Sequence, residues 1–269
     1  MRKPIYKALT IAGSDSGAGA GIQADLKTFA ALGVYGTSVI TAITAQNTVG
    51  VTKILELPAD LVAAQLDAVV EDIGAQALKT GMLANSAIIE IVAEKIREHR
   101  LHNLVVDPVM VAKGGDLLLR PEAIEALRSR LIPLAVIVTP NLPEAEQLTG
   151  IPGSRLQDIK ESARRIIAMG ARSVVIKGGH RKGPATDIFY DGKQFRQLTA
   201  PRLRTPNTHG TGCTFSAAIA AGLAKGEKLE NAVVEAKRYI TQAIRKGFPI
   251  GSGHSPVHHF YRFWGKGTK

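Results

Sequence analysis

The chain has 269 residues, a formal net charge of +11 and a hydrophobic content of 45%. This length allows one large α/β domain or two small ones, and the apolar content is enough for a substantial core. The single cysteine excludes an intrachain disulfide and is typical of a reducing compartment, so we expect a cytoplasmic protein. The sequence contains no run of about 18 apolar residues, so we expect no membrane span. The segment before the first predicted strand is too short to be a signal peptide.

The positive charge is spread along the chain instead of forming a basic stripe. Predicted helices such as 122–130 and 155–172 mix lysines and arginines with acidic residues. A nucleic-acid interface would instead show clustered basic residues with aromatic residues between them. We therefore interpret the charge as a solvated surface and expect no nucleic-acid partner.

Short apolar strands alternate with amphipathic helices through the first half of the chain. We expect strands at Lys7–Ala12, Val34–Thr44, Val51–Leu57 and Ala77–Leu83. We expect helices at Ala20–Leu32, after Pro58 and after Asn85, which can cap its helix. A glycine-rich loop at Gly13–Gly21 joins the first strand to the first helix.

The alternation continues in the second half and includes a hairpin at Asp191-Gly192. We expect strands at Leu104–Met110, Ala135–Thr139, Ser173–Lys177, Ile188–Tyr190 and Gln194–Thr199. We expect helices after Pro121, at Pro143–Leu148, between Ser154 and Gly170, after Gly210 and at Leu229–Arg245, before an irregular tail at 251–269. This pattern predicts a three-layer α/β/α sandwich with a mainly parallel central sheet, and the lack of a linker predicts one domain over 1–269.

Unusual loops follow the predicted strands. Parallel sheets place their ligand sites beyond the carboxyl ends of the strands, so we expect these loops to share one crevice. They are Gly13–Gly21, Gln46-Asn47, Thr80–Met82, Asp107–Met110, Asn141–Glu144, Lys177–His180 and Thr208–Cys213.

The stretch Thr208–Leu223 reads THGTGCTFSAAIAAGL and combines two glycines with the start of a small, apolar helix. Free amides and the positive end of the helix dipole at such a start favour phosphate. A thiol in that position should have a lowered pKa, which makes Cys213 a candidate reactive group. The alternative is that Cys213 is a small buried residue that begins a core helix.

Three charged residues also follow predicted strands. Asp107 and Glu144 are candidate Mg²⁺ ligands, because phosphoryl transfer needs a metal near the phosphate chain. Lys177 could neutralise a triphosphate. The alternatives are that Asp107 belongs to a turn-forming Asp-Pro, that Glu144 caps a helix and that Lys177 is an ordinary surface lysine.

Three other site types are disfavoured. The glycines of the first loop are not spaced as G-x-G-x-x-G, and the second strand lacks an acidic residue for a ribose, which argues against a nicotinamide enzyme. A P-loop motif is also missing. His254, His258 and His259 lie without a cysteine or carboxylate to complete a zinc site, so a mobile or interface tail is favoured there.

Taken together, these stretches resemble the ribokinase-like superfamily and, closely, the bacterial hydroxymethylpyrimidine/phosphomethylpyrimidine kinases of thiamine biosynthesis. The matching segments span most of residues 8–226 and are AGSDSGAGAGIQADLKTFAALG, GTSVITAITAQNT, KTGML, VVDPVMVAKGG, TPNLPEAEQLTG, VVIKGGH and HGTGCTFSAAIAAGLAKG. The resemblance implies a kinase that uses ATP and Mg²⁺ to phosphorylate 4-amino-5-hydroxymethyl-2-methylpyrimidine and then its monophosphate. Pyridoxal or pyridoxine kinase activity is the alternative, and we expect a homodimer.

The resemblance also implies roles for individual residues. Gln46 would read the aminopyrimidine edge, and the pyrimidine pocket would be lined by Gly13, Ala18, Asp25, Met82 and Val109. Asp107 and Glu144 would serve the metal and phosphates, with Lys177 and Thr211 on the ATP side. The anion hole would be formed by Gly210, Gly212 and Cys213, and Cys213 stands where many relatives carry a catalytic aspartate.

One departure bears on the substrate. The family's dual-activity branch, which also phosphorylates pyridoxal, carries a second cysteine after DPVM. This chain has Ala112 there, which favours the pyrimidine.

Overall fold

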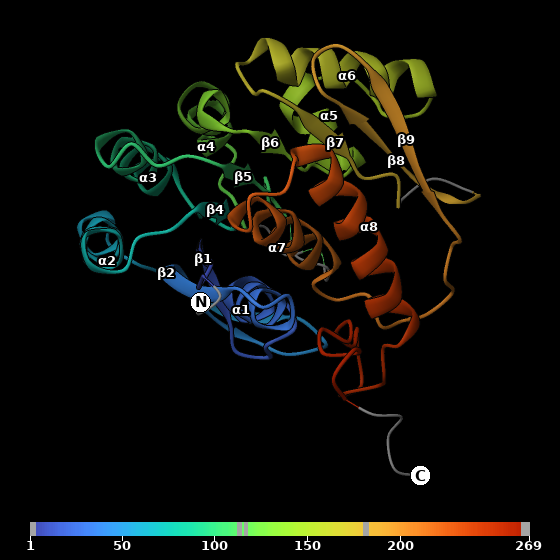
Figure 1. Ribbon diagram of the computed structural model, residues 1–269, viewed down its shortest axis with the longest axis horizontal. Coiled ribbons are helices and arrows are strands. Elements are labelled where there is room, and N and C mark those ends of the chain that lie inside the picture. Colours follow the sequence, from blue (N-terminus) through green and yellow to red (C-terminus); the bar gives the residue numbers. More distant parts are fainter. Residues whose placement is uncertain (1–3, 112–114, 116–117, 180–182, 265–269) are drawn as a thin grey trace.

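The computed structural model describes residues 4–111, 115, 118–179 and 183–264, and one sheet runs through them (Figure 1). The strands are β1 (Lys7–Asp15), β2 (Tyr35–Gln46), β3 (Val51–Glu56), β4 (Ala77–Thr80), β5 (Leu104–Val106), β6 (Ile137–Val138), β7 (Val174–Ile176), β8 (Ala185–Tyr190) and β9 (Phe195–Ala200). The helices are α1 (Gly21–Ala31), α2 (Ala59–Asp72), α3 (Ser86–Glu98), α4 (Ala123–Ala126), α5 (Leu142–Thr149), α6 (Leu156–Ala168), α7 (Thr211–Ala224) and α8 (Leu229–Arg245).

The sheet is parallel in the middle and antiparallel at both edges. Its strand order is β3-β2-β1-β4-β5-β6-β7-β8-β9. The pairs from β2 to β7 are parallel, whereas β3 and the β8–β9 hairpin run antiparallel to their neighbours. Strand β1 has β2 on one side and β4 on the other, so the chain reverses its direction of winding there, and a crevice opens at such a point.

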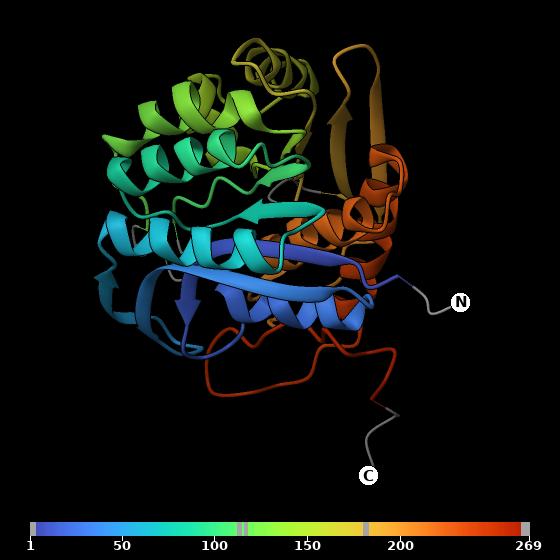
Figure 2. The same ribbon diagram turned by 60° about the vertical axis from the view of Figure 1, so that its left-hand side comes forward.

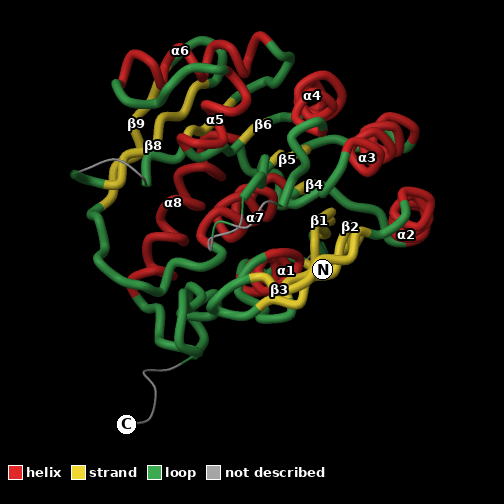
Figure 3. The backbone as a smooth tube through the Cα atoms, turned by 180° about the vertical axis from the view of Figure 1, so that it is seen from behind, coloured by secondary structure: helices red, strands yellow, loops and turns green. Residues whose placement is uncertain are grey.

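Helices cover both faces of the sheet (Figures 1 and 3). One apolar core lies under α2, α3, α4, α5 and α6, and Figure 2 shows α2, α3 and α4 side by side. A second core lies under α1, α7 and α8 on the opposite face. The central strands are short apolar runs such as Leu104–Val106, which suit a sheet buried on both faces.

The predicted three-layer sandwich with a mainly parallel sheet is therefore confirmed. The hairpin around Asp191-Gly192 and the cap of α3 are also confirmed, since the Asn85 side chain accepts a hydrogen bond from the amide of Ile88. All nine strands in the described residues join one sheet, and one domain over 1–269 stays a prediction.

Several element boundaries were predicted wrongly. Strand β5 ends at Val106, not at Met110, because Asp107 precedes a proline that lacks the amide for further pairing. The helix predicted after Pro121 is present, as α4 over Ala123–Ala126 and a π-helical turn over Leu127–Leu131. None of the helices in the described part of the chain combines the length and the apolar composition that crossing a membrane requires.

The segment after α8 is irregular, as expected, but its middle part, from Ser255 to His259, is packed against the protein. Ser255, Val257 and His259 are buried. The Ser255 carbonyl accepts a hydrogen bond from the His209 amide, which ties this segment to the loop before α7. His259 Nε2 lies 3.0 Å from the hydroxyl oxygen of Thr214 on α7. The segment therefore supports the first turn of α7.

We predict that His259 makes the protein acid-sensitive. Burial lowers the pKa of His259 to about 3, and the charge of Lys27 acts in the same direction. The unfolded chain therefore takes up a proton at His259 below about pH 6.5, while the folded protein does not until about pH 3. Across that window the free energy of unfolding should fall by up to about 1.4 kcal/mol per pH unit, measured by urea unfolding.

His259→Gln should flatten this dependence, because glutamine does not titrate. His102→Gln serves as the matched control, since His102 is exposed, and it should leave the dependence as it is. Identical pH profiles for the wild type and His259→Gln would refute the prediction.

Candidate active site

A cavity of about 700 Å³ opens beyond the carboxyl ends of the parallel strands. Its size is typical of a small-molecule site. The predicted site residues that line it are Gly13, Gln46, Met82, Asp107, Val109, Glu144, Lys177, Gly210, Thr211, Gly212 and Cys213. The crevice predicted from the loop positions is therefore present, and Ala18 and Asp25 are the predicted residues that do not line it.

The first turn of α7 forms one wall of the cavity. Gly210 precedes the helix with a φ of 75°, and a side chain there would collide with the carbonyl oxygen of Gly19. Only glycine therefore fits where this loop meets the glycine-rich loop. The Thr211 amide donates a hydrogen bond to the Thr208 carbonyl. The Gly212 and Cys213 amides have no acceptors within the helix, so they can bind an anion in the cavity.

Cys213 lies in this first turn and is partly exposed. Its predicted lowered pKa is wrong: burial raises the pKa of the thiol to about 11. The charge of Lys79 and a hydrogen bond from the Gly21 amide lower the pKa, but they do not outweigh the loss of solvent. In the free protein the group is therefore a thiol at neutral pH.

Two carboxylates and one ammonium group lie together beside α7. Lys177 Nζ lies 3.0 Å from Asp107 Oδ1 and 3.9 Å from Glu144 Oε2. Burial alone would lower the pKa of Lys177, but the two carboxylates raise it overall, so the ammonium is charged. Burial, with the charge of Asp107, raises the pKa of Glu144 to about 7. Lys177 is therefore an ion-paired residue of the site, not an ordinary surface lysine.

The alternative interpretation of Glu144 as a helix cap is also confirmed. Its side chain accepts a hydrogen bond of 2.7 Å from the Asn141 amide, and the Asn141 side chain accepts one from the Glu144 amide. This capping box fixes the carboxylate at the start of α5, where it still faces Lys177. Capping and a place in the site are therefore compatible.

The carboxylate pair fits a hard divalent cation. Asp107 Oδ2 is buried and has no hydrogen-bond partner within the described residues, so one oxygen remains available as a ligand. A Cβ at Gly212 would lie 3.7 Å from this atom, which places it against the start of α7. Oxygen donors of this kind are the ones Mg²⁺ prefers.

The opposite wall contains Gln46 at the end of β2. Its Oε1 accepts a hydrogen bond of 3.1 Å from the Thr44 hydroxyl, and its Nε2 lies 3.4 Å from His209 Nε2. His209 Nε2 also lies 2.9 Å from Asp15 Oδ2. His209 thus connects the glycine-rich loop, Gln46 and the loop before α7, and these contacts orient the amide of Gln46.

Ala18 and Asp25 lie elsewhere. The Ala18 carbonyl accepts a hydrogen bond of 2.8 Å from Lys27 Nζ, and its backbone has a φ of 58°. Asp25 has no exposed surface and forms an ion pair of 2.8 Å with Lys79. The structure does not bring either residue into the cavity wall with the other predicted site residues.

Several cavity residues were not predicted from the sequence. Lys79, Asp187 and Lys237 line the cavity and lie outside the loops predicted to form it, whereas Asp15 and His209 lie within two of those loops but were not singled out. The Lys237 ammonium lies 2.7 Å from Asp187 Oδ2, and this pair connects α8 to β8. The available signal was a lysine within the apolar run ALKTGML, since a charged residue in a buried strand calls for a partner. Ala112 and His180 lie outside the described residues.

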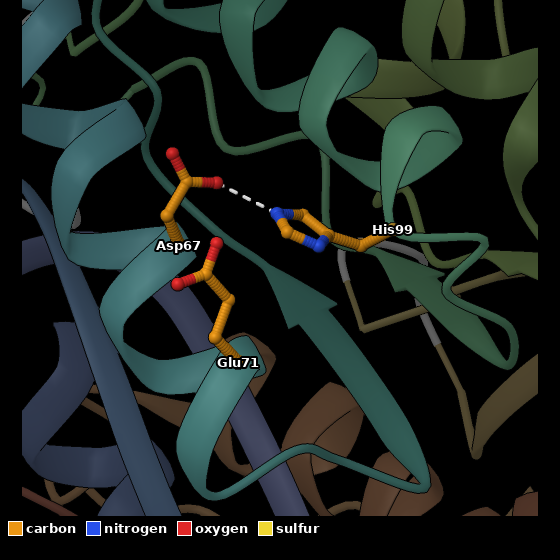
Figure 4. A group of neighbouring side chains, drawn as sticks. All are labelled: Asp67, Glu71 and His99. Atoms are coloured by element: carbon orange, nitrogen blue, oxygen red, sulfur yellow. Dashed lines mark hydrogen bonds and ion pairs between the residues drawn. The ribbon is translucent and has the colours of Figure 1, made fainter.

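A second cluster lies on α2 and at the end of α3 and consists of Asp67, Glu71 and His99 (Figure 4). Asp67 lies 2.6 Å from His99 Nε2 and 2.8 Å from Lys95 Nζ. Both oxygens of Asp67 are thus already paired. The charge of Lys95 would repel a metal cation, so we assign no metal here. His258 packs against Trp264, and His259 bonds to Thr214, so these two histidines of the C-terminal segment have structural partners.

The family model described as phosphomethylpyrimidine kinase matches residues 15–258. A hydroxymethylpyrimidine/phosphomethylpyrimidine kinase of Bacillus subtilis is 52% identical over 258 residues, which are 95% of this chain and 95% of that protein. A thiamine biosynthesis bifunctional protein of Geobacter sulfurreducens is 54% identical over 95% of this chain, which spans only 52% of that relative's length.

Among solved structures, the ADP complex of Bacillus subtilis pyridoxal kinase superposes with a TM-score of 0.89 at 46% identity, covering 95% of this chain and 98% of that one. The site geometry agrees with these similarities, since an anion-binding helix start and a carboxylate pair share one cavity. The family model and the sequence identity lead to one conclusion: the chain belongs to the phosphomethylpyrimidine kinase family.

Proposed function

We propose that the protein transfers the γ-phosphoryl group of ATP to the hydroxymethyl oxygen of 4-amino-5-hydroxymethyl-2-methylpyrimidine, and then phosphorylates the monophosphate to the diphosphate, in thiamine diphosphate biosynthesis. The observation that carries this proposal is that one cavity is lined by the α7 start, by Gln46, and by Asp107, Glu144 and Lys177. The names of the relatives and the ADP-bound structural neighbour support it.

Gln46 would hold the ring, because its amide can donate to and accept from an aminopyrimidine edge. Gly13, Met82 and Val109 would form the apolar walls around the ring. Ala18 and Asp25 have no place in this assignment, since they do not line the cavity.

The amides of Gly210, Thr211, Gly212 and Cys213 would stabilise the charge that develops on the transferred phosphoryl group. Lys177 would bind the phosphate chain of ATP. Cys213 would accept the hydroxymethyl proton as a thiolate. The thiol must lose its own proton first, because its pKa is raised in the free protein.

Asp107 and Glu144 would hold Mg²⁺, and the unpartnered Oδ2 of Asp107 supports this assignment. When bound, the ion would neutralise charge on the phosphate chain. The contacts with Lys177 keep both carboxylates close to the first turn of α7.

Pyridoxal phosphorylation is the second candidate, and the similarity to a pyridoxal kinase structure favours it. A hydroxymethyl group on a six-membered nitrogen ring is common to both substrates, so the same cavity chemistry serves either one.

The location and the oligomeric state belong to the same proposal. The single cysteine supports a reducing compartment such as the cytoplasm. Ile43 and Leu55 are cross-strand neighbours on β2 and β3, and both are exposed. This apolar pair supports a homodimer through the β2–β3 face, which the molar mass in solution would test.

We predict that ATP turnover depends on the pyrimidine alcohol. A coupled assay of ADP formation should show strong stimulation by the hydroxymethylpyrimidine and by its monophosphate, and less by pyridoxal. Stimulation by pyridoxal alone would replace the first candidate by the second. No stimulation by any of the three would overturn both.

We predict that Cys213→Ala lowers kcat by about 100-fold or more, because the proton acceptor is lost. The affinity for ADP, measured by calorimetry, should persist, because the phosphate-binding amides remain. Cys213→Ser is the matched control and should retain more turnover than the alanine variant. Turnover of Cys213→Ala close to wild type would remove the proton-acceptor role.

We predict that Gln46→Ala raises the KM for the pyrimidine much more than the KM for ATP, because it removes the donor and acceptor that read the ring. Gln194→Ala is the matched control, since Gln194 is exposed in the β8–β9 hairpin. Equal changes in both KM values for Gln46→Ala would contradict a role in reading the ring.

A further inference from the structure

The Asp107 carboxylate is held through one of its two oxygens. Oδ1 accepts a hydrogen bond of 3.0 Å from Lys177 Nζ and one of 3.2 Å from the Thr139 hydroxyl. Oδ2 is buried and has no hydrogen-bond partner within the described residues, and it lies against the start of α7 at Gly212. The two donors thus leave free the oxygen that is next to the anion-binding turn.

The Thr139 hydroxyl is not explained by local structure alone. Thr139 directly follows β6 and has no exposed surface. A buried hydroxyl is costly unless it is hydrogen-bonded, and valine has the same branched shape without that cost. The contact of the hydroxyl with the Val106 carbonyl, at 3.4 Å, is longer than its contact with Asp107. The carboxylate is therefore a better reason for the hydroxyl than the backbone is.

A second buried hydroxyl connects Thr139 to α7. Ser216 Oγ lies 2.8 Å from Thr139 Oγ1 and 3.0 Å from the carbonyl oxygen of Gly212. The Ser216 side chain also has no exposed surface. The chain of contacts thus runs from the carboxylate to the peptide that joins Gly212 to Cys213, which supplies one of the free amides of the cavity.

The direction of the hydrogen bonds follows from the number of protons. Each hydroxyl has a single proton to donate, and a carboxylate oxygen only accepts. Hydrogen bonds to a charged acceptor are about twice as strong as those between neutral groups. Thr139 therefore donates to Asp107, which leaves the Ser216 proton to be shared between Thr139 Oγ1 and the Gly212 carbonyl. Ser216 in this way holds the Thr139 oxygen in place.

We propose that Thr139 is a positioning residue for Mg²⁺: its hydroxyl, held by Ser216, fixes the Asp107 carboxylate so that Oδ2 stays available as the ligand atom. Lys177 is assigned to the phosphate chain of ATP, so Thr139 is the donor that remains on Oδ1 once the nucleotide binds. This role rests on the proposed function of Asp107 as a Mg²⁺ ligand. Its test measures binding, so it does not depend on kinase activity.

The test measures the affinity for ADP by calorimetry, once with Mg²⁺ and once with a chelator in its place. The metal-free affinity reports on the amides of α7, and the gain on adding Mg²⁺ reports on the carboxylates. Thr139→Val should lower the affinity with Mg²⁺ about tenfold, the smaller of the losses typical when a hydrogen-bond partner of a metal ligand is removed. It should leave the metal-free affinity unchanged. Ser216→Ala should lose less, because Thr139 still bonds to Asp107.

Thr139→Ser is the conservative variant and should restore the gain from Mg²⁺, because it keeps the hydroxyl. Thr28→Val is the matched control, since Thr28 is also fully buried and donates a hydrogen bond of 2.7 Å to the Ala24 carbonyl within α1. It should leave both affinities unchanged. If Thr139→Val does not fold, Thr139→Ala takes its place with the same expected result.

The proposal is overturned if Thr139→Val, or its alanine substitute, keeps the wild-type gain from Mg²⁺, or if Thr139→Ser does not restore that gain. It is also overturned by an equal loss with and without Mg²⁺, which a merely structural role would give, and by the lack of any gain in the wild type. Phosphorylation assays separate it from the proposed function. Failure of the wild type to phosphorylate any tested alcohol would refute the function, while a loss confined to Mg²⁺ would still establish the effect of Thr139 on the metal site.

Discussion

The packing of α7 into the centre of the protein is the constraint on which the site depends. All its residues from Thr214 to Ala224 are buried, and five of these eleven are alanine and one is glycine. At Gly222 a Cβ would lie 2.8 Å from the Cβ of Ala232, so small residues allow α8 to approach closely. Because the helix cannot shift, its first turn stays at the carboxyl edge of the sheet, and the free amides there have a fixed direction.

Two loops and the C-terminal segment hold that first turn from the outside. Gly210 contacts the glycine-rich loop, and His209 bonds to Asp15 on one side and to the backbone of Ser255 on the other. His259 reaches Thr214 from the same segment. The residues after α8 thus act as a brace for the site. This explains why several of them are buried although the segment has no regular structure.

The site is built from charges that are neutralised in pairs before any ligand binds. Lys177 faces Asp107 and Glu144 on one side of α7, and Lys79 faces Asp25 on the other. Breaking such a buried pair costs about 3–5 kcal/mol, so each charge holds its partner in place. The arrangement keeps the polar groups ordered in an otherwise apolar cavity. A bound phosphate chain would replace some of the ion-pair partners and would find the charged groups already ordered.

The amino-acid pattern was enough to predict the layers of the fold and the edge of the sheet at which the site lies. Apolar runs such as SVVIK and helical periodicity in segments such as α8 depend on neighbours in the chain, so local patterns revealed them. The glycines around Cys213 and the polar residues after each strand likewise predicted the residues that meet in the cavity. The predicted ends of the strands were less accurate, because a strand ends where its partner strand diverges from it.

The electrostatic state of the site depends on the folded arrangement and could not be predicted from local patterns. The raised pKa of Cys213 depends on how much solvent the packed helix excludes, and a helix start in the sequence does not reveal this. The pairing of Asp25 with Lys79 joins residues 54 positions apart and withdraws Asp25 from the predicted pocket. Ion pairing and desolvation act through space between distant segments, so they appear only once the chain is folded.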